Sequence, residues 1–131
     1  MAKISIHDNV MTGYEVRCES CEIVLHTEFR EREPREITDV VFRGVEAYHI
    51  YGDNMHTILF DVEEATFDEI FQYYAAQFEE GIRFCWPGAW NTSEAACRDD
   101  FEKAGCKAWI IASSYGATGF VVARTMELKQ L

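Results

Sequence analysis

The stretch TILFDVEEATFDEIFQYYAAQFEEG (residues 57–81) passes directly from a strand pattern to a helix pattern. Ile58, Phe60 and Val62 alternate with their neighbours, and this period of two predicts a strand over residues 57–62. A strand that leads into a helix within 25 residues indicates a domain that contains both kinds of element.

The helix in this stretch has both of its ends marked. Thr66 followed by Glu69 forms a capping box, in which the hydroxyl accepts from a free backbone amide and the glutamate reaches back. Aromatic and aliphatic residues then recur at helical spacing, and Gly81 stands where a C-terminal cap is expected.

The segments before this stretch are predicted to be strands. Residues 11–17 and 22–29 show strand patterns, and a charged hairpin loop follows at residues 30–36. Residues 37–51 are rich in β-branched and aromatic residues, and Gly44 is expected to divide them by a bulge or bend.

The segments after it add a second helix and a hairpin. We expect a short strand at residues 82–86, a helix at 93–104 ended by Gly105, and a hairpin of residues 107–113 and 120–126. Residues 1–131 are thus predicted to form one α+β domain. Its sheet, a meander plus a C-terminal hairpin, is antiparallel or mixed, with two helices packed on one face.

Composition narrows the class of protein. At 131 residues and 48% hydrophobic content the chain can bury a single core without disulfides, and five cysteines cannot all pair. No apolar run approaches the length of a membrane span, and the first residues lack the apolar stretch of a secretion signal, so we expect a cytoplasmic protein. A net charge of −11 argues against binding to nucleic acid.

No motif specifies a cofactor, a metal or a catalytic residue. Cys18 and Cys21 form a Cys-x-x-Cys, but no second close pair of ligands accompanies them, and they are predicted to lie in a β-turn. The Gly-containing stretch at residues 113–119 lacks the Gly-Lys-Ser/Thr ending of a phosphate loop, and a hairpin turn is the preferred interpretation.

The acidic residues are unevenly distributed. No lysine or arginine occurs between Gly44 and Ile82, whereas the same window holds nine carboxylates. A charged helix face is usually just solvated, but the predicted helix also ends on Glu79 and Glu80, where its dipole disfavours negative charge. Trp86 and Trp90 follow, either as lids of the core or as anchors of an interface. The predicted partner-binding residues are Asp61, Glu63, Glu64, Asp68, Glu69, Trp86 and Trp90.

Three stretches in the first half of the chain occur together: IHD at residues 6–8, VVFRGV at residues 40–45 and ILFDVEE at residues 58–64. In this combination the chain resembles small bacterial immunity proteins, the antidotes encoded beside polymorphic or contact-delivered toxins. The resemblance consists mainly of strand framework and assigns no binding residues. It implies a non-enzymatic protein that binds and blocks a toxin domain, which is often basic.

The leading hypothesis is therefore an acidic module that binds a basic protein through electrostatic complementarity. The alternative is a small enzyme or ligand-binding domain with a pocket among the aromatic residues and His7, His49 or His56, because histidines and carboxylates can serve in acid–base chemistry. A third possibility is a homo-oligomeric structural protein.

Overall fold

The computed structural model describes residues 4–31, 33–87 and 93–131. The strands are β1 (Val10–Arg17), β2 (Glu22–Phe29), β3 (Glu36–Arg43), β4 (Ala47–Tyr51), β5 (Ile58–Ala65), β6 (Lys107–Tyr115), β7 (Thr118–Ala123) and β8 (Thr125–Gln130). The helices are α1 (Phe67–Tyr73), α2 (Ala75–Ile82) and α3 (Glu94–Lys103).

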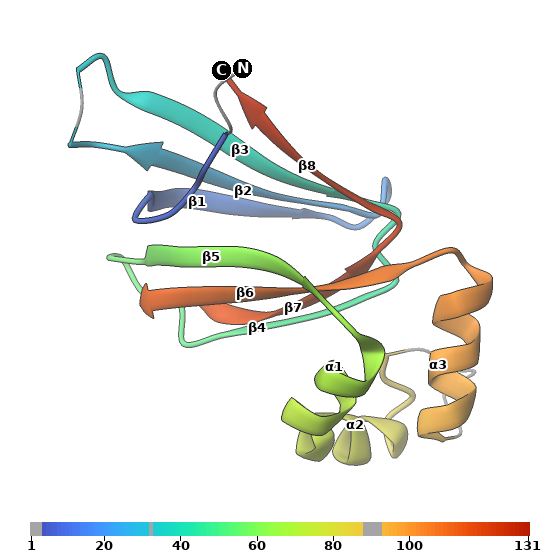
Figure 1. Cartoon of the computed structure of the whole chain (residues 1–131). Coiled ribbons are helices and arrows are strands. Elements are labelled where there is room, and N and C mark those ends of the chain that lie inside the picture. The colour runs from blue at the N-terminus through green and yellow to red at the C-terminus, as the bar shows by residue number, and fades with distance from the viewer. Residues whose placement is uncertain (1–3, 32, 88–92) are drawn as a thin grey trace.

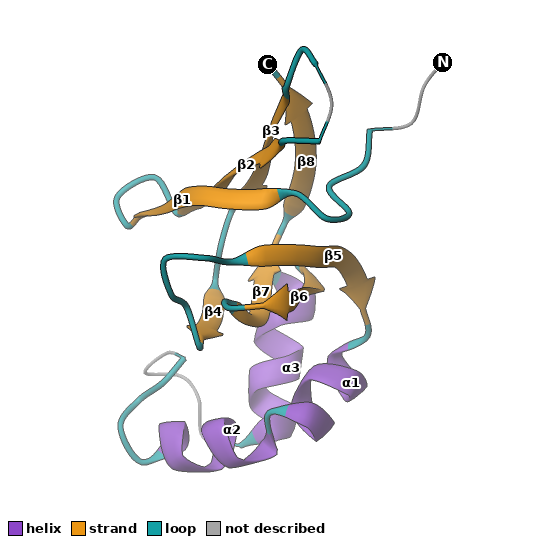
Figure 2. Cartoon of the chain, turned by 90° about the vertical axis from the view of Figure 1, so that its left-hand side faces the viewer, coloured by secondary structure: helices purple, strands orange, loops and turns teal. Residues whose placement is uncertain are grey.

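All eight strands belong to one antiparallel sheet, in the order β4-β7-β6-β5-β1-β2-β3-β8. The sheet is bent into two layers, with β1, β2, β3 and β8 in one and β4, β5, β6 and β7 in the other (Figure 1). The layers join where Val10 of β1 pairs with Ile58 of β5. The helices lie beneath the second layer, on its side away from the first (Figure 2). The predicted α+β fold, with helices on one face of the sheet, is confirmed.

Side-chain alternation along the strands produces two cores. The first fills the space between the two layers and includes Leu25 and Phe42 from one layer and Leu59 and Trp109 from the other. The second lies between the β4–β7 layer and the helices. Its members include Ile70, Phe71, Phe78, Phe101, Phe120 and Val122. Because successive residues of a strand point to opposite sides, β7 contributes to both cores.

The predicted first helix begins as expected but is divided in two. Thr66 Oγ1 accepts a hydrogen bond from the Glu69 amide at 3.1 Å, and the Glu69 carboxylate lies 3.3 Å from the same hydroxyl. At Tyr74 the backbone leaves the helical region, with φ −114° and ψ 29°, so α1 ends and α2 begins. The chain therefore has three described helices, where two were predicted.

The prediction that Gly81 caps the helix is wrong. Gly81 lies inside α2, and its missing side chain is explained by packing, because a Cβ there would come within 2.4 Å of Trp86 Cε3. The predicted strand at residues 82–86 is also wrong. α2 continues to Ile82, and the amides of Arg83 and Phe84 then donate to carbonyls of the last helical turn.

The other breaks and caps agree closely with the sequence pattern. Gly44, at φ +66°, separates β3 from β4, and Gly105, at φ +75°, follows α3. Ser93 Oγ accepts from the Ala96 amide and caps α3. The predicted strand at residues 120–126 is interrupted at Arg124, because the chain crosses there to the other layer. Beyond Arg124 the chain forms β8, which pairs with β3. β8 is an edge strand that the sequence analysis did not predict.

None of the described helices has the length and apolarity needed to cross a lipid bilayer.

Candidate functional site

The five predicted carboxylates lie at the end of β5 and the start of α1, but they do not share one face. Glu63 pairs across the sheet with Ile110, which packs on the second core, whereas Glu64 pairs with Trp109 of the first core. Since cross-strand partners point to the same side, Glu63 and Glu64 point to opposite sides of β5.

Four of these carboxylates already have partners, that of Glu69 being the Thr66 hydroxyl of the helix cap. The Glu64 carboxylate lies 3.7 Å from Lys107 Nζ, and that of Asp68 pairs with Arg98 of α3. Asp61 is half-buried and accepts from the Val62 amide at 2.8 Å. Basic residues outside the cation-free window of the sequence therefore partly neutralise the surface that it predicted.

Other exposed carboxylates on β5 and α2 have no basic partner among the described residues. Glu63, Glu79 and Glu80 are exposed and form no ion pair with any residue that the structure describes. Residues 61–107, which include the second half of β5 and the three described helices, contain eleven carboxylates and four basic residues. This segment thus contributes seven of the eleven net negative charges of the chain.

Trp86 lies beside this charge, at the end of α2. Its ring contacts Phe78 at 5.3 Å, Phe120 at 6.3 Å and His49 at 6.3 Å between ring centroids, and the residue is half-buried. It therefore lies on the second core as a lid, while part of its surface stays exposed; its role as an interface anchor stays a prediction. Trp90 lies outside the described residues.

Two adjoining concavities surround Trp86. One runs beside β4 and is lined by Glu46, Ala47, Tyr48, His49, Ile50, Trp86 and Pro87. The other opens onto α2 and is lined by His49, Gln77, Glu80, Gly81, Phe84 and Trp86. His49 and Trp86 line both concavities, and we refer to the two together as the groove. The groove unites residues from β4 and α2 that are far apart in the sequence.

The three candidate histidines do not converge. His49 lies in the groove, stacked on Tyr51 at 5.3 Å. His7 packs against Phe60 of β5, and strands β6 and β7 separate β5 from β4. His56 lies in the loop between β4 and β5. Of these, the groove contains His49, whose ring contacts in the described structure are with aromatic side chains.

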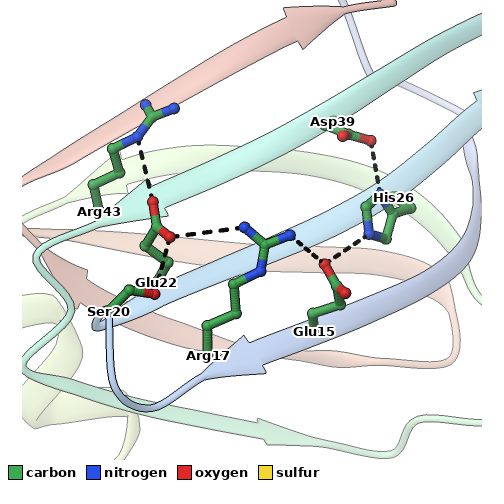
Figure 3. A network of polar contacts seen from close by, with 7 residues as sticks. All are labelled: Glu15, Arg17, Ser20, Glu22, His26, Asp39 and Arg43. Atoms are coloured by element: carbon green, nitrogen blue, oxygen red, sulfur yellow. Dashed lines mark hydrogen bonds and ion pairs between the residues drawn. The ribbon is translucent and has the colours of Figure 1, made fainter.

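A polar network that the sequence analysis missed covers the outer face of the first layer (Figure 3). His26 Nδ1 lies 2.9 Å from Asp39 Oδ1, and His26 Nε2 lies 3.3 Å from Glu15 Oε2. Arg17 then links Glu15 to Glu22. Arg43 extends the contacts to Glu22 and Glu127, so the network crosses all four strands of the layer. The alternation in residues 22–29 placed His26 on a common face with Val24 and Glu28, but the partners on β1 and β3 depend on strand register.

The network changes the ionisation of its members. The hydrogen bond to Asp39 raises the pKa of His26; partial burial opposes this rise, and the hydrogen bond to Glu15 adds a smaller increase. The pKa of Glu15 is lowered, first by its hydrogen bond with Arg17 and then by His26. The carboxylates therefore favour a charged imidazole in the folded protein.

Because the folded-state pKa of His26 is raised, its contribution to stability is complete below the ordinary histidine value of 6.5 and disappears as pH rises through the folded value. Asp39→Asn is expected to lower the His26 pKa and to flatten this pH dependence. An NMR titration of the imidazole, together with urea unfolding across neutral pH, measures both effects. Asp53→Asn is the matched control, since Asp53 bonds Tyr14 instead. An unchanged His26 titration in Asp39→Asn would contradict the assignment.

Cys18 and Cys21 are exposed, whereas Cys97 and Cys106 are buried. Cys18 and Cys21 lie in the turn between β1 and β2, where the Cys21 amide donates to the Cys18 carbonyl at 3.4 Å. Burial raises the pKa of Cys97 to about 12 and also raises that of Cys106. Among the described residues, no three His, Cys, Asp or Glu side chains gather closely enough to hold a metal ion. Residues 113–119 contain the turn of the β6–β7 hairpin, as predicted, with Gly116 and Ala117 between the two strands.

Comparisons with protein-family models, with curated proteins and with solved structures found no match to this chain.

Proposed function

We propose that this chain is a non-enzymatic, cytoplasmic binding module that captures a basic protein through the negative surface of β5 and the helices. The observation that carries the proposal is the concentration of net charge in residues 61–107, together with Glu63, Glu79 and Glu80, which are exposed and form no ion pair within the described part of the chain. Such a surface accelerates association with a positively charged partner and makes binding sensitive to salt.

The groove adds apolar contacts to this electrostatic attraction. Phe84 is 75% exposed, and it lines the groove with half-buried Trp86 and with Glu80. Aromatic residues at the centre of an interface commonly provide much of its binding energy, whereas charged residues around them guide the approach. The resemblance to immunity proteins is consistent with this division and suggests a toxin domain as the basic partner.

The experiment is affinity capture of partners from the native cell at low and high salt, with charge-reversal variants of the chain as bait. We expect Glu63→Lys, Glu79→Lys and Glu80→Lys together to weaken capture by roughly tenfold or more, because attraction becomes repulsion at three exposed positions. The unfolding transition should change little, since these carboxylates have no ion-pair partner among the described residues.

The matched control reverses Glu19, Glu31 and Glu33, which are exposed in loops of the first layer and give the same net charge. Equal loss in both triple variants would show that overall charge, rather than this surface, governs capture. Equal capture by the wild type and by the Glu63, Glu79 and Glu80 variant would refute the proposed function.

A further inference from the structure

We propose that β4 accepts an extended, basic segment of the partner as an additional strand at the edge of the sheet. This inference rests on the proposed function and assigns the binding site and the conformation of the bound segment. Its basis is the shape of the groove beside β4, the composition of that strand and the charge around it.

The shape is set by how β4 lines the groove. Five consecutive residues, 46–50, contribute to one concavity. Because successive side chains of a strand point to opposite faces, a concavity over one face would touch alternate residues alone. Contact with every residue in turn means that the groove follows the backbone edge. At roughly 3.3 Å per residue, five residues give room for an extended segment of similar length.

The edge is also chemically open. β4 has β7 as its one neighbour in the described sheet, so its other side carries backbone groups that no strand pairs. Its sequence, Ala-Tyr-His-Ile-Tyr, contains no lysine, arginine or carboxylate. The opposite edge strand, β8, contains both Glu127 and Lys129, charges of the kind that discourage further strand pairing. Of the two edges, β4 is therefore the one suited to strand addition.

Charge and aromatic surface define the occupant. Glu46 lines the concavity beside β4 and Glu80 lines the one beside α2; both residues are exposed and form no ion pair with the described residues. Trp86 and Phe84 offer apolar surface on which the methylene stems of arginine or lysine can lie while their charged ends reach a carboxylate. Arg83 is exposed nearby on the chain but does not line either concavity.

The test uses the full chain and a defined probe, a peptide of about ten residues that alternates arginine and threonine. Two matched peptides accompany it, one with alternate backbone nitrogens methylated and one with glutamate in place of arginine. Fluorescence anisotropy measures affinity, and residue-resolved amide hydrogen exchange locates the bound strand. We expect slower exchange in β4, no change in β8, and binding that disappears with either matched peptide.

Variants of the groove supply a second readout. Glu46→Lys with Glu80→Lys is expected to weaken the peptide by roughly tenfold or more, whereas Glu31→Lys with Glu33→Lys leaves it nearly unchanged. Unfolding in urea establishes that both double variants remain folded. A similar loss in both would show that the peptide responds to overall charge alone, and the strand-addition site would be rejected.

The remaining outcomes also decide the matter. Absence of binding, protection of β8 instead of β4, or equal binding of the methylated peptide overturns the inference. Self-association in light scattering, with protected β4 amides and no peptide, would identify a second copy of the chain as the occupant and also overturn it. Salt-sensitive capture of the native partner without protection of β4 would reject this site while leaving the proposed function intact.

Discussion

Replacing Phe120 with alanine should destabilise the folded protein by about 3–5 kcal/mol, the range for truncating a buried phenylalanine. Phe120 is fully buried at the centre of the second core, and its ring lies 4.8 Å from Tyr74 and 5.5 Å from Phe78. The cavity would lie between the helices and the sheet, beneath Trp86. Urea unfolding followed by tryptophan fluorescence measures the loss.

Phe84→Ala is the matched control, because it removes the same ring from a side chain that is 75% exposed. It should change the free energy of unfolding by no more than about 0.5 kcal/mol. If the two substitutions cost the same, the helices cannot be packed on the sheet as described. Phe84→Ala has a further use, since it removes apolar surface from the groove without disturbing the core.

Gly119→Ala should cost about 3 kcal/mol or more, at or beyond the upper end of the usual penalty for overpacking. A Cβ at position 119 would lie 1.8 Å from the His49 carbonyl oxygen and 2.9 Å from Ile50 Cα, both of them backbone atoms of β4. Neither can rotate aside as the end of a side chain would. The added methyl group must therefore push β4 away from β7, and amide exchange in β4 should accelerate along with the loss of stability.

Gly13→Ala provides the comparison for this substitution. Gly13 also lies in a strand, but no heavy atom beyond its chain neighbours lies within 4 Å of the position that its Cβ would occupy. Its substitution should leave the free energy of unfolding within about 0.5 kcal/mol of the wild type. A neutral Gly119→Ala would mean that β4 does not pack against β7 in the described register.

The features that could be predicted are those determined by residues close together in the sequence. The alternation of β2, the cap at Thr66 and the break at Gly44 all arise within a few residues. Gly81 shows how a local pattern misleads, because its position at the end of a helical period resembles a cap. Its real cause is the ring of Trp86, which the chain brings back onto the helix after leaving it.

The candidate site could be predicted only in part, for the same reason. The cation-free window was visible in the sequence, but the neutralisation of Asp68 by Arg98 joins residues 30 positions apart. Because successive side chains of a strand point to opposite sides, Glu63 and Glu64 lie on opposite faces of β5 although they are adjacent in the sequence. The groove is a product of tertiary structure throughout, because it forms where β4 passes the end of α2.

The position of β8 has a consequence for how the protein is made. Arg43 of β3 bonds Glu127 of β8 across a separation of 84 residues, so β3 has no outer neighbour in the sheet until β8 has been synthesised. During synthesis, the hairpins of β1, β2 and β3 would present an open border to other nascent chains.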